Sequence, residues 1–314
     1  MMLARVADSL YWIGRYVERA EHMCRLSDVM LNATLDRTDA ATQVARIALA
    51  AVGAPDPERA AAPYEAARSL VLDRGDAGSI VSSLARAREN ARQVRDQITT
   101  ETWERLNLVF LRMTAPEAHK AFTDGSSVFL HETIADLHLF KGAADATMSH
   151  GEGWRFLLLG MYLERAQLTA RLLEVCFGDD GRPALRDHFA LTAALRMSCA
   201  LEPYLRAYTA DIQPRLILRF LLLDEDFPRS LRFSTTQIEE HLSSLTKYLA
   251  SSAQIGPERL AGRLKARLQY ADMQEIEAQG AGAFLATVGD ECAAIHDALH
   301  EAFVAYPLEL RLPA

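Results

Sequence analysis

Two Glu-Arg pairs, set in similar stretches of the sequence, carry the side chains best suited to chemistry. Glu18 and Arg19 lie in YVERAEHMCRL, and Glu164 and Arg165 lie in YLERAQLTARL. A carboxylate can act as a general base, and a guanidinium can hold a carboxylate or a phosphate. Successive side chains on a helix point about 100° apart, so the members of one pair cannot bond well with each other. Each therefore needs a partner from another part of the chain.

The residues around each pair predict a helix that is covered on more than one side. In residues 3–30, apolar side chains recur every three or four positions along two stripes, and residues 156–177 repeat this design. One apolar stripe is typical of a helix that packs on one side, whereas two stripes indicate a helix surrounded by others. We therefore expect two central helices, each with its arginine inside an apolar stripe.

A reciprocal exchange would satisfy both pairs. If the two central helices lie side by side, Glu18 can reach Arg165 while Glu164 reaches Arg19. Losing one partner of a buried ion pair costs about 3–5 kcal/mol, so such an exchange would fix the register of the two helices. This interpretation makes the pairs structural.

The alternative interpretation places a pocket beside the same residues. Several arginines that face carboxylates could hold an anionic group, with Glu18 or Glu164 as the general base of a cryptic enzyme. The candidate cluster, structural or ligand-binding, consists of Glu18, Arg19, His22, Arg25, Glu89, Arg92, Arg95, Asp96, Glu164, Arg165, Arg171, Arg229 and Arg232. The sequence leaves open whether the protein is an enzyme.

The whole chain predicts an all-α fold. Good helix formers dominate, glycine and proline fall between the periodic segments, and no alternating β-branched run occurs. We expect a helical bundle of about ten helices in a single domain over residues 1–314. The two similar stretches, with a weaker echo between GDAGS and FPRS, predict an internal pseudo-twofold duplication with repeats of about 1–150 and 151–314.

Several classes of site and location are not expected. No Glu-x-x-His, P-loop, dinucleotide-binding or nucleophile-elbow motif occurs, and only His131 and His138 hint at a metal, so we expect neither a metal nor a cofactor. The net charge of −8 disfavours nucleic acid as a partner. The short apolar runs and the scattered cysteines favour a cytoplasmic protein without a membrane span, signal peptide or disulfide.

The chain resembles the bacterial alpha-E domain family. RVADSLYWIGRYVERAEHMCRL, SIVSSLARARENARQVRDQITTETWERLN and GWRFLLLGMYLERAQLTARLLEV carry the resemblance, which extends over essentially the whole sequence. Such proteins are all-helical with a characteristic Glu-Arg motif. The resemblance implies a genomic setting beside a circularly permuted ATP-grasp protein and a transglutaminase-like cysteine peptidase, in some bacteria with a proteasome-like peptidase. It implies no settled activity.

Two functions follow as expectations. The first is a non-catalytic or accessory helical component of an ATP-grasp-linked system for peptide synthesis or modification, which binds the ATP-grasp partner or its peptide substrate. The second is a cryptic enzyme that acts on a peptide or acyl intermediate, with a Glu/Arg site between the two repeats.

Overall fold

A computed structural model describes residues 2–35, 38–178, 187–246 and 256–304, and these residues form helices without a strand. The all-α class is confirmed. The helices are α1 (Ala4–Ala33), α2 (Thr38–Ala51), α3 (Pro57–Ala60), α4 (Pro63–Leu72), α5 (Ile80–Gln93), α6 (Thr100–Thr114), α7 (Ala118–Asp124), α8 (Ser126–Thr147), α9 (Glu152–Phe177), α10 (His188–Met197), α11 (Leu201–Tyr208), α12 (Pro214–Leu223), α13 (Leu231–Thr246), α14 (Gly256–Gln269), α15 (Met273–Gln279) and α16 (Ala281–Phe303).

The expected number of about ten helices is too low, because the described residues contain sixteen. Short breaks divide segments that the sequence pattern reads as continuous. Pro63 occupies the first turn of α4 and separates it from α3, and Gly125 separates α7 from α8. Proline cannot donate a backbone hydrogen bond and glycine lowers helix propensity, so both end helices where the periodic pattern alone would continue.

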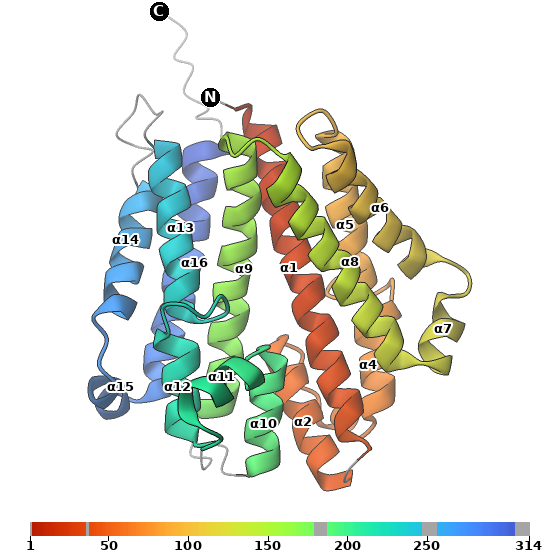
Figure 1. Ribbon diagram of the computed structural model, residues 1–314, viewed down its shortest axis with the longest axis vertical. Helices are drawn as coiled ribbons and strands as arrows, with labels where there is room; N and C mark the ends of the chain where they lie inside the picture. The colour runs from red at the N-terminus through yellow and green to blue at the C-terminus, as the bar shows by residue number, and fades with distance from the viewer. Residues whose placement is uncertain (1, 36–37, 179–186, 247–255, 305–314) are drawn as a thin grey trace, which may run out of the picture.

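Two long helices, α1 and α9, lie side by side at the centre of the molecule (Figure 1). Near their starts, the backbone nitrogen of Met2 donates to Glu152 over 2.7 Å. Further along, Arg165 contacts Glu18. The contacts follow the same order in both helices, which therefore run parallel, and both helices are largely buried as the double apolar stripes predict.

The central helices approach each other closely at two glycines. A Cβ atom on Gly14 would overlap the carbonyl oxygen of Leu157, and one on Gly160 would overlap the carbonyl oxygen of Tyr11. Only glycine permits such proximity between helix backbones. The two contacts mirror each other, as a pseudo-twofold would require, but the duplication itself stays a prediction.

The other helices surround this pair (Figure 1). The helices α2, α4, α5 and α8 pack against α1, whereas α13 and α16 pack mainly against α9. Side-chain caps begin α3 and α5, where Asp56 and Ser79 accept backbone hydrogen bonds from the first turns. All four cysteines are free thiols, and three of them are buried. These layers determine which polar side chains can reach the central helices.

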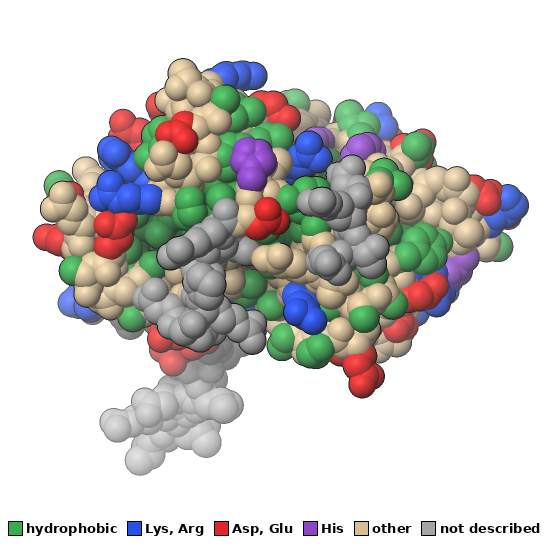
Figure 2. Space-filling view, turned by 90° about the horizontal axis from the view of Figure 1, so that it is seen from below, with side chains coloured by type: hydrophobic (Ala, Val, Ile, Leu, Met, Phe, Trp, Pro, Cys, Tyr) green, Lys and Arg blue, Asp and Glu red, His purple; other side chains and the backbone are tan. Residues whose placement is uncertain are grey.

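The described surface carries both signs of charge. Figure 2 shows one end of the molecule, where Lys and Arg side chains are interspersed with Asp and Glu rather than gathered by sign. Hydrophobic side chains lie between them. Among the described residues, no helix has the length and apolar character that crossing a membrane requires.

We predict that Gly14→Ala destabilises the protein by about 1–3 kcal/mol or more, because the new methyl group collides with backbone rather than with a movable side chain. Gly142→Ala is the matched control, since nothing lies within 4 Å of a Cβ atom at this helical position. The control should gain about 0.5–1 kcal/mol from helix propensity. Urea unfolding of both variants measures the difference. Equal stabilities would contradict the close crossing.

Candidate functional site

The predicted reciprocal exchange is present between α1 and α9. Arg165 donates from Nε and Nη2 to the two oxygens of Glu18, over 2.8 and 2.9 Å. In the opposite direction, Arg19 donates from Nε to Oε1 of Glu164 over 2.6 Å. Both carboxylates lie inside the protein, with side-chain exposures of 0% for Glu18 and 3% for Glu164. The two pairs therefore join the central helices through buried charge-assisted hydrogen bonds.

Around the first pair, further charges form what we call the Glu18 cluster: Glu18, Glu21, Arg25, Lys141, Arg165 and Arg229. Lys141 of α8 lies 2.5 Å from Glu18 and also contacts Glu21. Arg229, from the loop before α13, contacts both carboxylates as well. Arg25 donates to Glu21 from the next turn of α1, over 2.7 Å. Cations from four parts of the chain thus enclose two carboxylates that have no exposure to solvent.

The surrounding cations keep both carboxylates ionised. Burial alone would raise the pKa of Glu18, but Arg165, Lys141 and Arg229 outweigh burial and hold this pKa well below its usual value. Burial likewise opposes ionisation of Glu21, where Lys141 and Arg229 again lower the pKa. A carboxylate with a low pKa binds a proton weakly. The Glu18 cluster is therefore suited to holding helices together and poorly suited to general-base catalysis.

His22 lies beside the Glu18 cluster and is also buried, at 3% exposure. Burial, followed by the positive charge of Arg229, lowers its pKa to about 4. Its Nε2 atom has no hydrogen-bond partner. The imidazole is therefore neutral at physiological pH and takes part in the cluster as a packed neighbour rather than as an ion-pair partner.

Around the second pair, a smaller group forms the Glu164 cluster: Glu164, Arg15, Arg19 and Gln167, with Tyr11 beside it. Arg15 uses its whole guanidinium. It contacts Glu164 through Nε, and it donates to Tyr11 over 2.7 Å and to Gln167 over 2.6 Å. Arg19 binds Glu164 only through Nε. Two arginines thus share one buried carboxylate.

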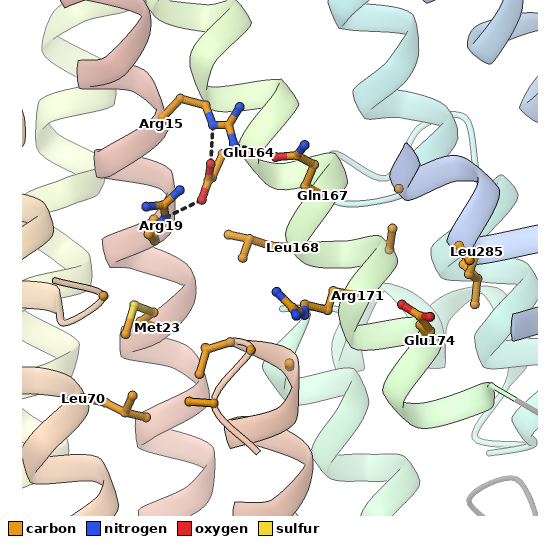
Figure 3. A pocket seen from close by; sticks show the side chains of 18 of the residues that line it. Arg15, Arg19, Met23, Leu70, Glu164, Gln167, Leu168, Arg171, Glu174 and Leu285 are labelled. Carbon is orange, nitrogen blue, oxygen red and sulfur yellow. Dashed lines mark hydrogen bonds and ion pairs between the residues drawn. The ribbon is translucent and has the colours of Figure 1, made fainter. Parts of the chain in front are cut away.

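A cavity of about 730 Å³ opens beside the Glu164 cluster. Arg15, Arg19, Glu164 and Gln167 form part of its lining, and Arg171 of α9 projects into the same space (Figure 3). The volume lies within the range of about 300–1,000 Å³ that is typical of ligand pockets. The second Glu-Arg pair therefore borders a space large enough for a small molecule.

Other candidates from the sequence do not join these clusters. Glu89 and Arg92 form an exposed pair on α5, with side-chain exposures of 49% and 63%. Arg95 and Asp96 contact close neighbours in the turn after α5. Arg232 binds the loop before α13 instead of a central glutamate. Packing explains why the charged residues of α5 lie away from the central helices. The apolar side of α5 faces α1, so its charged side faces α6 and solvent.

The two histidines considered for a metal have separate contacts. His131 lies 3.1 Å from Asp28, whereas His138 contacts Glu21 over 3.2 Å. Asp136, which lies near them in sequence, binds Arg112. Within the part of the chain that the structure describes, no group of three or more potential ligands is placed to hold a metal ion.

Four contributors to the clusters were not singled out by the sequence analysis: Arg15, Glu21, Lys141 and Gln167. The spacing of Glu21 could have predicted its place in the cluster, because it lies three residues after Glu18 and so shares its helix face. Arg15 lies one turn before Arg19 and offered the same signal. Lys141 offered none, because it reaches the cluster from α8 through tertiary packing alone.

We predict that Glu18→Gln lowers the free energy of unfolding by about 3–5 kcal/mol, because it leaves buried cations without a full partner. Glu89→Gln removes the carboxylate of an exposed pair and should change stability by less than about 1 kcal/mol. Urea unfolding checks both.

A double variant, Glu18→Gln with Arg165→Met, removes both partners and should recover part of the loss. Coupling between contacting residues is about 0.5–3 kcal/mol. The comparison also needs the single variant Arg165→Met. If the loss of stability in the double variant equals the sum of the losses in the two single variants, Glu18 and Arg165 do not stabilise each other.

We also predict that stability falls as the pH drops from about 6.5 to 4, partly because of His22. In the unfolded chain this histidine binds a proton near pH 6.5, whereas in the folded protein its pKa is about 4. The unfolded state therefore binds more protons in this window, and acid favours it. His22→Gln should show a shallower fall when urea unfolding is compared between about pH 7 and pH 4.5. An unchanged slope would exclude a buried neutral His22.

Curated relatives of this chain are known from mycobacteria. The sequence is 28% identical to an uncharacterised protein of Mycobacterium bovis, over 98% of this chain and 37% of that protein. Uncharacterised proteins of two Mycobacterium tuberculosis strains are 28% and 27% identical over the same shares. The chain thus spans little more than a third of the length of these relatives. No solved structure matches the sequence.

A family model matches nearly the whole chain. Residues 2–304 match the alpha-E family, described as a predicted alpha-helical domain with a conserved ER motif. The match includes Glu18-Arg19 and Glu164-Arg165, the two Glu-Arg pairs that exchange partners between α1 and α9. The chain belongs to the alpha-E family.

Proposed function

We propose that this protein is a non-catalytic, accessory helical component of an ATP-grasp-linked system for peptide synthesis or modification. In this role it binds the ATP-grasp partner or its peptide substrate. One observation carries the proposal: the carboxylates of both motif glutamates form buried ion pairs between the central helices. Residues that would be the natural catalytic groups are engaged in holding the fold, which supports a binding role.

The cryptic-enzyme alternative has one observation in its favour, since Glu164 borders the cavity. Against it, Arg15 and Arg19 each bind one oxygen of this carboxylate. Glu18 is less suitable still, because it is fully buried and its pKa is held low. A general base needs a free oxygen within hydrogen-bond reach of the proton that it removes. The geometry therefore favours binding over acid–base chemistry.

The proposed partners come from the family resemblance. They are a circularly permuted ATP-grasp protein, a transglutaminase-like cysteine peptidase and, in some bacteria, a proteasome-like peptidase. All would meet this protein in the cytoplasm. An ATP-grasp enzyme forms amide bonds through acyl phosphates, so a helical companion could present a peptide to it or complete its binding groove.

The test is a co-purification and sizing experiment with the neighbouring ATP-grasp protein, followed by an assay of ADP release with ATP and amino acids. We expect a stable complex and ADP release that depends on this chain. Failure to form a complex, with ADP release unaffected by this chain, would refute the accessory role.

The double variant Glu18→Gln/Arg165→Met separates structure from catalysis in the same assay. If the pairs are structural, the folded double variant supports ADP release at close to the wild-type rate. If Glu18 is catalytic, the variant forms the complex but loses the activity by a factor of about 100 or more. Thermal unfolding confirms that the variant is folded before it is assayed.

A further inference from the structure

Among the differences between the two Glu-Arg stretches, one replaces a carboxylate with an amide. Glu21 in the first stretch is matched by Gln167 in the second. Glu21 binds Arg25 from the next helical turn, so this guanidinium is neutralised. Arg171 is the match of Arg25, and it has no hydrogen-bond or ion-pair partner among the described residues. With an amide at Gln167 in place of a carboxylate, Arg171 has no ion-pair partner one turn earlier on its helix.

Arg171 is exposed, and a close neighbour is the turn after α2. Its guanidinium lies against the backbone of Gly53, where a Cβ atom would be only 2.8 Å from Nη1. Gly53 ends α2 in a left-handed conformation, with a φ of 79°, which glycine adopts without strain. From α9, the Arg171 side chain points into the space between α9 and α1 (Figure 3). The cavity therefore contains an exposed guanidinium that lies next to Gly53 and has no ion-pair partner among the described residues.

A second arginine offers donors to the same space. Arg19 binds Glu164 through Nε alone, and its terminal nitrogens have no hydrogen-bond partner in the described part of the chain. Its side chain keeps 27% exposure and lines the cavity. Paired guanidinium groups are the protein groups best matched to a carboxylate. Arg19 and Arg171 therefore both offer guanidinium donors to the cavity.

The charges of the lining disfavour a strongly anionic ligand. It includes three arginines but four acidic residues, and Glu164 already binds two of those arginines. Glu174 and Asp290, from α9 and α16, line the cavity without a hydrogen-bond partner among the described residues. They would repel a phosphate ester and attract an ammonium group. Met23, Leu70, Leu168 and Leu285 add an apolar surface.

We infer that this cavity binds a ligand that carries a carboxylate, an amino group and an apolar side chain, namely an amino acid or a peptide end. Arg171 and Arg19 bind the carboxylate, Glu174 and Asp290 attract the amino group, and the leucines contact the side chain. The role of this site rests on the proposed accessory function, since the site would hold the peptide or amino acid that the ATP-grasp partner uses. Binding itself requires only this chain.

Isothermal titration of the purified full chain tests the site. The probes are the dipeptide Ala-Leu, its C-terminal amide, its N-acetyl form, free leucine and inorganic phosphate. We expect Ala-Leu or leucine to bind with a Kd below about 1 mM, and either modification of Ala-Leu to weaken binding about tenfold, as expected for one charge-assisted contact. Preference for leucine identifies a free amino acid as the source, and preference for Ala-Leu identifies a peptide.

Variants locate the binding. Arg171→Gln should weaken the better probe about tenfold without changing the melting temperature, because this side chain has no partner to lose. Arg105→Gln is the matched control, an exposed arginine on α6 without a partner among the described residues and outside the cavity lining. It should bind as the wild type does.

Three results would overturn the inference: no binding by leucine or Ala-Leu, phosphate binding as tightly as they do, or an unchanged affinity in Arg171→Gln. None of these results depends on the ATP-grasp protein. Conversely, loss of the complex with that protein leaves the titration unaffected, so the two proposals can fail separately.

Discussion

The structure depends on the requirement that a carboxylate removed from water must be surrounded by cations. Glu18 has no exposed surface, and it stays ionised because Arg165, Lys141 and Arg229 all reach it. These cations come from α9, from α8 and from the loop before α13. The orientation of each of these elements relative to α1 is therefore tied to one charge. An isolated buried carboxylate would instead favour its neutral form or an unfolded chain.

The glycine crossing makes this exchange of charges geometrically feasible. Gly14 and Gly160 allow the backbones of α1 and α9 to touch one turn before the Glu-Arg pairs. From there, each arginine needs to span only the narrow gap to the opposite helix. Because the helices run parallel, the same spacing from glycine to glutamate serves both partners. Close packing and charge pairing thus support each other: a wider gap would leave the guanidinium groups short of the carboxylates.

The sequence predicted this core because the Glu-Arg pair occurs twice. Neighbouring residues on one helix cannot pair well, so two copies of the motif allowed a reciprocal solution that required no knowledge of the other helices. Lys141 could not be predicted in this way, since its approach depends on how α8 packs across α1. Glu89 and Arg92 of α5 were misplaced for a related reason. Their spacing shows that they share a face, but the rotation of α5 about its own axis depends on which of its faces packs against α1. Short breaks such as the one at Pro63 likewise depend on local backbone geometry rather than on periodicity.

The two clusters show how one motif can support two different local outcomes. Around Glu18, a second carboxylate at Glu21 shares Lys141 and Arg229 with Glu18. Around Glu164, the matching residue is Gln167, whose amide accepts one hydrogen bond from Arg15 and attracts no further cation. The side chain of Arg171 then has no carboxylate one turn earlier on α9, where Arg25 has Glu21, and it lines the cavity. The carboxylate at position 21 and the amide at position 167 are thus one difference between the two clusters, alongside the cations that reach Glu18 from α8 and from the loop before α13. Both pairs thus join the central helices, but only the second one borders a cavity.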